Sequence, residues 1–521
     1  MNKNLYELDK LYKENKFNQV VKKTKELIKS DNIIAPFYNL LGLSLSRLGK
    51  DREAEITFLE GIDKFPDEIS LKSNAALTQI NLKKNDKAQE NINRALKINN
   101  KDTFTLYALG HLKREQLKYE EAIEIFKSIC EKNVKFGRSL LLLGQSYLDL
   151  AQKNNQEKYY DLAKKNLLLC SELFPNLYGV DYTLSSIIDY SKNNFHQKKM
   201  LSKIDKQGLI DHEKYLIYFA LGKSFEDQKK FSQSSEFIKI ANKLKNETIL
   251  DNPLKKEKLK IRNIKNIFTK YPISNINQQN LFKKKIIFIV GLPRSGTTLV
   301  HQLLSSSDNT FGFGESRFLN EFFENNIFNE NFLSKLLNKK NSEKELIKIS
   351  NEIGEKYNSI SKKNIFIDKM PPNYNWIGFI KLIFPNSKVV HIKRNIKDNI
   401  LSIYKNYFGT RIMDWSYDEN NIFNYWIHYN DIMKFWSKKY NNFVYQLSYE
   451  NLVKNKEKET KNLYNFCELE WNDKVFDFYK NAKTIRTVSI NQVKKPIYKN
   501  SVGSSQNFTN YFDFLNRFVD I

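Results

Sequence analysis

The first half of the chain carries a pattern that recurs with a period of about 34 residues, and this period limits the folds open to it. In its first frame, small residues stand at Gly42 and Ala54, the bulky Phe58 follows, and Pro66 closes the unit. The equivalents of Gly42, Ala54 and Phe58 in later frames are Ala76, Ala88 and Ile92, then Gly110, Ala122 and Phe126, then Gly144, Ala163 and Leu167, then Gly222, Ser234 and Ile238. Units of this length that each form a helix pair stack on one another, so the pattern predicts an α-solenoid over residues 1–250.

This pattern resembles the tetratricopeptide repeat. Small side chains at the Gly42 and Ala54 positions let two helices approach closely, and bulky ones at the Phe58 position fill the groove between successive pairs. Residues 1–34 resemble a degenerate first repeat, whereas residues 176–214 look helical but do not fit the frame. The resemblance implies a concave surface that binds a peptide or protein partner.

The charge balance is strongly basic, with 85 Lys and Arg residues against 59 Asp and Glu residues and a net charge of +26. Lysine is spread along the whole chain, and the sequence has no zinc-finger spacing, RNA-recognition motif or basic zipper. We therefore expect no nucleic-acid partner, and the charge instead suits small anionic ligands.

Three cysteines are too few for a disulfide framework, which favours a cytoplasmic location. No apolar run reaches the roughly 18 residues of a transmembrane helix, so we expect no membrane span. No group of His and Cys residues has metal-ligand spacing, so we expect no metal.

A strand followed by a glycine-rich turn opens the second half. The polar stretch before it predicts a linker at residues 251–282 and a second domain at residues 283–521. Residues 286–290 form a short apolar run rich in β-branched side chains, which is typical of a buried parallel strand. The turn at residues 291–298 has the glycine spacing of a nucleotide phosphate loop, whose backbone N–H groups hold an anion at a helix N-terminus. Thr297 stands where such loops carry lysine, which disfavours an ATPase, GTPase or kinase that uses magnesium.

The turn, which reads Pro-Arg-Ser-Gly-Thr-Thr, resembles the 5′-phosphosulfate loop of sulfotransferases that use 3′-phosphoadenosine-5′-phosphosulfate. The subtype is similar to tyrosylprotein sulfotransferases and to bacterial fusions of tetratricopeptide repeats with a sulfotransferase. The resemblance covers roughly residues 284–503 and implies an α/β P-loop-like sulfotransferase domain with a central parallel sheet. It implies that the donor nucleotide is bound by Arg294, Ser295, Gly296, Thr297 and Thr298.

A second strand and turn resemble the 3′-phosphate site of that family. Arg394 follows the strand candidate at residues 388–392, and Ser402 lies eight residues after Arg394. Tyr449, in a Tyr-Glu-x-Leu segment, matches a tyrosine that contacts the nucleotide. Ser489, in a Ser-x-x-Gln-Val-x-x-Pro segment, matches a polar residue in a segment that closes over the cofactor, and we group it with the catalytic residues.

Two further catalytic candidates come from the same resemblance. Glu315, in a Gly-Glu segment after the loop helix, matches the general base that takes the proton of the acceptor hydroxyl. Lys369, in Lys-Met-Pro, matches a lysine that neutralises charge on the bridging oxygen as the sulfuryl group leaves. Asp368 is expected to orient Lys369. His301 and His391 are alternative bases, because other sulfotransferases use histidine, but their positions are more typical of packed or capping histidines.

We therefore predict a sulfotransferase that moves a sulfuryl group from the donor nucleotide to a hydroxyl acceptor, without a metal. A protein tyrosine is the leading acceptor, and a glycan or lipid hydroxyl comes next. The alternative from another class is a tetratricopeptide scaffold with an inactive nucleotide-binding domain. That alternative stays open because, after Gly503, the chain lacks the basic residue and tryptophan that are usual in the family.

Overall fold

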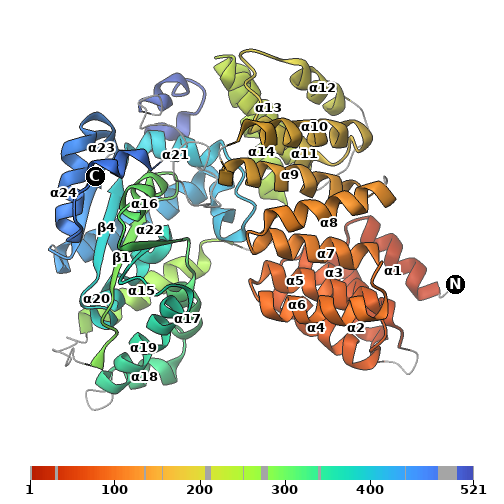
Figure 1. The fold of residues 1–521 in the computed structure, drawn as a ribbon, viewed down its shortest axis with the longest axis horizontal. Coiled ribbons are helices and arrows are strands. Elements are labelled where there is room, and N and C mark those ends of the chain that lie inside the picture. Colours follow the sequence, from red (N-terminus) through yellow and green to blue (C-terminus); the bar gives the residue numbers. More distant parts are fainter. Residues whose placement is uncertain are drawn as a thin grey trace. The chain divides into compact units, whose positions relative to one another are not determined.

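The structure is a computed structural model that describes residues 3–29, 33–133, 136–154, 156–205, 213–249, 252–270, 280–337, 342–440, 442–478 and 502–519. The chain divides into two compact units (Figure 1). The first comprises Met1–Ile188 and Lys203–Leu209, and the second comprises Asp189–Ser202 and Ile210–Ile521.

The first unit is a stack of antiparallel helix pairs. At Gly42 a Cβ atom would lie 2.4 Å from the ring of Phe58, and at Gly110 it would lie 2.7 Å from the ring of Phe126, so these close approaches require glycine. This packing confirms the predicted α-solenoid. The helices are α1 (Lys3–Lys13), α2 (Phe17–Leu27), α3 (Ala35–Arg47), α4 (Asp51–Lys64), α5 (Ile69–Asn81), α6 (Asn85–Ile98), α7 (Thr103–Glu115), α8 (Tyr119–Lys132), α9 (Gly137–Asn154), α10 (Glu157–Leu173) and α11 (Tyr178–Ser185), and α12 (Phe195–Ile204) crosses the division between the units.

The second unit is built around a parallel sheet of five strands in the order β2-β3-β1-β4-β5, which confirms the predicted α/β domain. The strands are β1 (Lys285–Gly291), β2 (Thr310–Gly314), β3 (Ile365–Lys369), β4 (Lys388–Lys393) and β5 (Val444–Ser448). The helices are α13 (Tyr215–Asp227), α14 (Phe231–Glu247), α15 (Lys255–Lys270), α16 (Thr297–Ser305), α17 (Phe318–Asn326), α18 (Glu330–Leu337), α19 (Ser342–Ile360), α20 (Ile377–Ile383), α21 (Ile396–Tyr404), α22 (Glu419–Lys439), α23 (Tyr449–Lys454) and α24 (Lys456–Cys467). Short 3₁₀ helices lie at Pro371–Trp376, Arg411–Tyr417, Asp473–Asp477, Ser504–Asn507 and Asp513–Arg517.

Helices cover both faces of this sheet. Along β1, Ile286, Phe288 and Val290 belong to the hydrophobic cluster that includes residues of α15, α17, α19, α20 and α22. The alternate residues Ile287 and Ile289 belong to the cluster that includes residues of α16, α23 and α24. Burial on both faces explains the uninterrupted apolar run of this strand, which is typical of parallel sheets.

The last repeat-like pair, α13 and α14, belongs to the second unit. The side-chain amide of Asn242 on α14 donates to the carbonyl of Tyr404 at the end of α21, over 2.9 Å. Glu226 on α13 forms an ion pair with Lys405, the next residue. The periodicity groups α13 and α14 with the repeats, whereas their packing groups them with the second unit. The domain boundaries at residues 250 and 283 therefore remain predictions.

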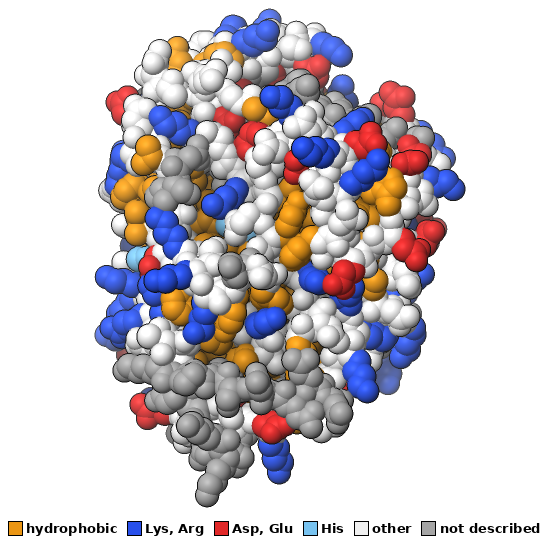
Figure 2. Space-filling view, turned by 90° about the vertical axis from the view of Figure 1, so that its left-hand side faces the viewer, with side chains coloured by type: hydrophobic (Ala, Val, Ile, Leu, Met, Phe, Trp, Pro, Cys, Tyr) orange, Lys and Arg blue, Asp and Glu red, His pale blue; other side chains and the backbone are white. Residues whose placement is uncertain are grey.

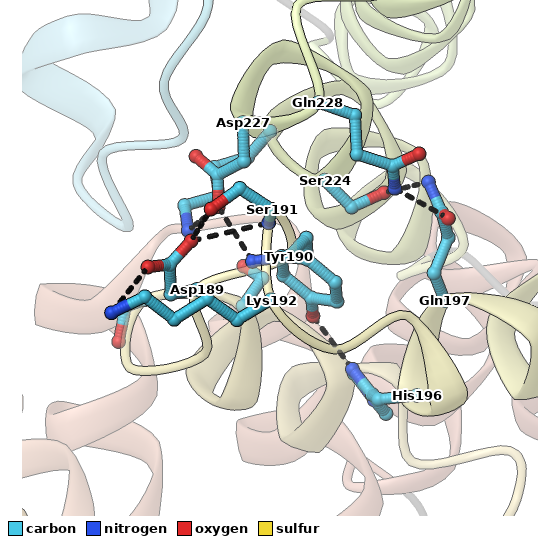
Figure 3. A network of polar contacts seen from close by, with 12 residues as sticks. Asp189, Tyr190, Ser191, Lys192, His196, Gln197, Ser224, Asp227 and Gln228 are labelled. Carbon is cyan, nitrogen blue, oxygen red and sulfur yellow. Dashed lines mark hydrogen bonds and ion pairs between the residues drawn. The ribbon is translucent and has the colours of Figure 1, made fainter.

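A polar network ties α12 and the segment before it to α13 (Figure 3). The backbone N–H of Tyr190 donates to the carboxylate of Asp227 over 3.2 Å. The side-chain amide of Gln197 donates to the hydroxyl of Ser224 over 2.9 Å, and both residues are buried. These bonds satisfy buried polar groups and account for the place of residues 189–202 in the second unit.

On the face that Figure 2 shows, the basic side chains do not gather into one stripe. There, the Lys and Arg side chains are scattered among acidic, polar and apolar ones. Among the helices that the structure describes, none is both long and apolar enough to span a membrane.

Candidate active site

The candidate site lies along one edge of the parallel sheet, where the carboxyl ends of β1, β3 and β4 meet. Ile289 of β1 pairs with Lys369 of β3, and Gly291 pairs with Ile392 of β4. The glycine-rich turn after β1, Lys369 at the end of β3 and Arg394 after β4 are therefore neighbours along this edge, which is where open α/β sheets bind ligands.

The turn after β1 has a backbone that only glycine allows at two positions. Gly291 has φ +154° and Gly296 has φ +105°. A Cβ atom on Gly291 would lie 2.8 Å from the carbonyl oxygen of Ile392, and one on Gly296 would lie 2.5 Å from the ring of Tyr449. Arg294 also adopts a positive φ of 68°, a conformation that is uncommon for residues other than glycine. The turn is thus held in one shape by its two neighbours, β4 and α23.

This turn leads into a helix N-terminus that can receive an anion. Gly296 is the N-cap of α16 and makes no side-chain cap, and the first intrahelical bond runs from the N–H of Val300 to the Gly296 carbonyl. Ser295 is buried, and its hydroxyl has no hydrogen-bond partner among the described residues. The turn pattern predicts that the backbone N–H groups of residues 295–298 hold the anion, but the N–H of Ser295 donates to the Leu292 carbonyl and so serves the turn itself. Thr297 and Thr298 form the start of the helix, where backbone N–H groups and the helix dipole favour negative charge.

Four of the predicted cofactor residues come together beside this turn. The Nε of Arg294 donates to the hydroxyl of Ser402 over 3.1 Å. The guanidinium of Arg394 donates to the carbonyl of Arg294 over 3.0 Å and lies 5.1 Å from the ring centre of Tyr449. Two guanidinium groups are thereby placed at the same sheet edge as the open helix N-terminus, and guanidinium groups bind phosphate and sulfate oxygens well.

Two residues that were not predicted from the sequence hold these groups in place. The side-chain amide of Asn399 on α21 donates to the Pro293 carbonyl over 2.8 Å and so ties α21 to the turn. The carboxylate of Glu450 accepts the N–H of Asn395 over 2.8 Å and so ties α23 to the start of α21. Glu450 stands within the Tyr-Glu-x-Leu segment that pointed to Tyr449, so that motif contained a signal for it. Asn399 carried no comparable signal.

Glu315 and Lys369 form an ion pair at the same edge. Glu315 directly follows β2, Lys369 ends β3, and the Lys369 ammonium lies 2.5 Å from the Glu315 carboxylate. The Lys369 side chain is 1% exposed and that of Glu315 is 46% exposed. A buried ammonium requires a partner of this kind, and the open side of the carboxylate can receive a substrate proton. The two predicted catalytic side chains are thus in contact.

Asp368 does not hold Lys369 in the way expected. Successive strand residues point to opposite faces of a sheet, so its carboxylate lies on the other face of β3 from the Lys369 ammonium. It accepts hydrogen bonds from the hydroxyls of Ser316 (2.6 Å) and Tyr357, and no described contact joins it to the Lys369 side chain. Burial raises the pKa of Asp368 to about 7, against the opposing effect of the two hydroxyl donors and of the Lys369 charge.

The two histidines have packing roles. The Nε2 of His301 accepts the N–H of Gly314 over 3.1 Å, which holds the end of β2 against α16. His391 is buried in β4 between Gln446 (2.7 Å) and the hydroxyl of Tyr429, and burial lowers its pKa to about 4. The described contacts of both rings are therefore contacts with the surrounding fold.

Ser489 lies outside the described residues, so its predicted role remains a prediction. Within the part of the chain that the structure describes, no group of three or more His, Cys, Asp or Glu side chains could hold a metal ion.

Comparison with known proteins agrees with this geometry. Residues 287–473 match the model of the sulfotransferase family. Residues 70–102 match the model of the tetratricopeptide repeat. The first range contains the glycine-rich turn, Glu315, Lys369 and Arg394. It supports a sulfotransferase domain that follows the repeats in the sequence.

Individual relatives are distant. An uncharacterized protein of Aquifex aeolicus (strain VF5) is 25% identical over an alignment of 559 residues with its gaps, and this alignment covers 94% of this chain and 69% of that protein. The sulfotransferase domain of the Synechococcus PCC 7002 olefin synthase is 17% identical, covers 48% of this chain and 100% of its own, and has a TM-score of 0.34. Pseudomonas aeruginosa PilF is 18% identical, covers 40% of this chain and 90% of its own, and has a TM-score of 0.31.

Proposed function

We propose that this chain transfers a sulfuryl group from 3′-phosphoadenosine-5′-phosphosulfate to a hydroxyl acceptor, with a tyrosine of a protein or peptide as the leading acceptor. The observation that carries this proposal is the Lys369–Glu315 ion pair, which lies at the same sheet edge as an open helix N-terminus and two guanidinium groups. A cytoplasmic location remains a prediction from the cysteine content.

The residues present fit a donor nucleotide that carries a 5′-phosphosulfate and a 3′-phosphate. The buried hydroxyl of Ser295, the N-terminus of α16 and the guanidinium of Arg294 would bind the 5′ end. Arg394 and Ser402 would bind the 3′-phosphate, because the planar guanidinium can hold two phosphate oxygens at once. The donor supplies an activated sulfur–oxygen bond when it is bound.

The chemistry assigned to the chain is a proton transfer and a charge neutralisation. Glu315 takes the proton of the acceptor hydroxyl as the oxygen–sulfur bond forms. The Lys369 ammonium stabilises the negative charge that develops on the oxygen whose bond to sulfur breaks. The repeat solenoid supports a protein or peptide acceptor, because stacked repeats present extended surfaces for such partners.

A thermal-shift comparison of nucleotides tests the donor. 3′-Phosphoadenosine-5′-phosphate at 100 times its Kd should stabilise the chain by about 2.7 kcal/mol. ATP with magnesium should stabilise it much less, since the turn has Thr297 in place of the loop lysine. Strong stabilisation by ATP with magnesium, and none by the 3′-phosphate nucleotide, would contradict the proposal.

Substitution of the candidate base tests the chemistry. Glu315→Gln should lower single-turnover transfer to a tyrosine peptide by about 10²–10⁴-fold and leave nucleotide affinity nearly constant. Lys369→Met should lower transfer by a similar factor, because the charge that it neutralises develops in the transition state. Glu330→Gln, which changes an exposed carboxylate on α18, is the matched control and should transfer at the unaltered rate. Undiminished transfer by Glu315→Gln would show that another group is the base.

A further inference from the structure

Behind the Lys369–Glu315 ion pair lies a second contact between the same two segments. Ser316 directly follows Glu315, and Asp368 directly precedes Lys369. The Ser316 hydroxyl donates to the Asp368 carboxylate over 2.6 Å, and Ser316 and Asp368 are both buried. The end of β2 and the end of β3 are therefore joined twice, once by the ion pair and once, one residue away, by this hydrogen bond.

Tyr357 on α19 completes a three-membered cluster. Its hydroxyl donates to the same oxygen of Asp368 and lies 3.3 Å from the hydroxyl of Ser316. Its ring is fully buried and packs edge-on against Phe313 (5.0 Å between ring centres) and Phe318 (4.9 Å). A ring enclosed in this way fixes the position of its hydroxyl, so the cluster is anchored to a helix outside the site.

The backbone alone holds this end of β2 weakly. The pairing of β2 with β3 shifts register between Gly312 and Gly314, immediately before Glu315. At such an irregularity the ladder of backbone hydrogen bonds is interrupted, so side-chain contacts must fix the position of Glu315. The Asp368 carboxylate is also costly to bury, because its second oxygen has no hydrogen-bond partner among the described residues.

We infer that Ser316, Asp368 and Tyr357 form a positioning cluster that sets Glu315 against Lys369, an inference that rests on the proposed function for its catalytic meaning. Asp368 and Tyr357 do not reach the acceptor. They act through Ser316 on the adjacent Glu315, and through the β3 backbone on Lys369. A displacement of about 1 Å in a catalytic pair is enough to lower a rate by about 100-fold.

Substitutions that remove a single hydroxyl group distinguish a role in positioning Glu315 from a role in the stability of the fold. Ser316→Ala and Tyr357→Phe each remove one hydroxyl and should lower kcat by about 10- to 100-fold, with little change in the Kd for 3′-phosphoadenosine-5′-phosphate. The matched control is Ser350→Ala. Ser350 is a buried serine on the same helix as Tyr357, accepts the N–H of Phe282 and donates to the Ile383 carbonyl. Loss of that hydroxyl should lower Tm without lowering kcat.

A double-substitution cycle shows whether Ser316 acts through Glu315. In a Glu315→Gln background, Ser316→Ala should change the residual transfer rate less than about twofold, because residues that serve one transition state do not add. The inference is overturned if Ser316→Ala retains the unaltered kcat, or if its effect is as large in the Glu315→Gln background as in the parent chain.

A labelling experiment keeps this inference apart from the proposed function. Reaction of Lys369 with an amine-reactive reagent, followed by peptide mass spectrometry, reports on the ion pair without any transfer. Ser316→Ala and Tyr357→Phe should label Lys369 several-fold faster than the parent chain, and Ser350→Ala should not. If the parent chain transfers no sulfuryl group but labelling follows this order, the proposed function fails and the positioning cluster stands. Equal labelling in all four proteins overturns the cluster.

Discussion

Two strand–turn–helix segments, β1 with α16 and β4 with α21, lie side by side at the same sheet edge, but they begin their helices differently. At α16 the N-cap is Gly296, with φ +105° and no side-chain cap. At α21 the N-cap is Asn395, whose side chain accepts the N–H of Asp398 over 3.2 Å. Asp398 is buried in the first turn, and its carboxylate accepts the N–H groups of Gly503 (2.6 Å) and Ser505 (2.7 Å).

This difference indicates two ways of binding an anion. The open N-terminus of α16 can offer backbone N–H groups, which suit an anion that approaches the turn closely. The N-terminus of α21 is already capped and carries a buried carboxylate, which would repel an anion there. An anion near β4 must therefore be bound by side chains, and Arg394 and Ser402 are the groups in place. Substitutions at the two turns and their helices test this contrast.

The largest effect is expected when the backbone of the first turn is disturbed. Gly296→Val adds side-chain atoms where a Cβ would already lie 2.5 Å from the Tyr449 ring, at a φ that costs a β-branched residue about 1–3 kcal/mol. We expect the displaced turn to hold the anion poorly, so that binding of 3′-phosphoadenosine-5′-phosphate, measured by calorimetry, weakens by about 100-fold, which is about 2.7 kcal/mol. Gly409→Ala is the control, because Gly409 also has a positive φ (53°) but open space, with the nearest atom 3.6 Å away. Equal binding by the two variants would show that the turn does not depend on this close approach.

The second effect concerns the side chain that serves β4. Arg394→Ala removes a charge-assisted contact and should weaken binding of 3′-phosphoadenosine-5′-phosphate by about 1.5–3 kcal/mol. Adenosine 5′-phosphosulfate, which lacks the 3′-phosphate, should lose much less. Arg394 also donates to the Arg294 carbonyl, so an equal loss for both nucleotides would mean that its role is to hold the first turn.

Local patterns in the sequence predicted this contrast only in part. The turn after β1 and the placement of Arg394 were predictable because glycine spacing and a strand-end arginine are features of a few consecutive residues. The hydrogen bonds that the N–H groups of Gly503 and Ser505 donate to Asp398 were not predictable, because the first of them joins residues 105 positions apart. The partners of Asp368 were not predictable either, because Ser316 lies 52 positions away in the chain and Tyr357 lies on a helix with no motif.

The repeats show the same limit. The 34-residue pattern predicted how helices pair within a repeat, since the small residues of one helix meet the bulky residues of the next. It contained no information about what the outer face of a pair contacts. Asn242 and Glu226 therefore gave no sign that α13 and α14 pack against α21 and the residue after it. The role of Ser489 remains a prediction.

The third effect is on stability. Asp398→Ala removes the carboxylate that binds two backbone N–H groups of the segment at residues 502–519, and should lower the free energy of unfolding by about 1–3 kcal/mol in urea. Asp398→Asn keeps one acceptor oxygen and should lose less. If both variants unfold at the urea concentration of the parent chain, the carboxylate does not hold the C-terminal segment in place.

The smallest effect tests the cap itself. Asn395→Ala removes the side-chain oxygen that accepts the Asp398 N–H, and the loss of such a cap costs about 1 kcal/mol. In a unit of this size that corresponds to a fall in Tm of roughly 1–2 °C. Asn455→Ala is the matched control, because Asn455 stands at the N-cap of α24 but makes no side-chain cap, and its Tm should stay close to that of the parent chain.

The two N-termini should also respond differently to an anion. Because Arg394 and Ser402 are unchanged in Asn395→Ala, its selectivity for the 3′-phosphate should equal that of the parent chain. A gain in affinity for inorganic phosphate or sulfate on removal of the cap would show that α21, like α16, binds anions through its backbone once its N-terminus is opened. That result would contradict the assignment of the β4 site to side chains.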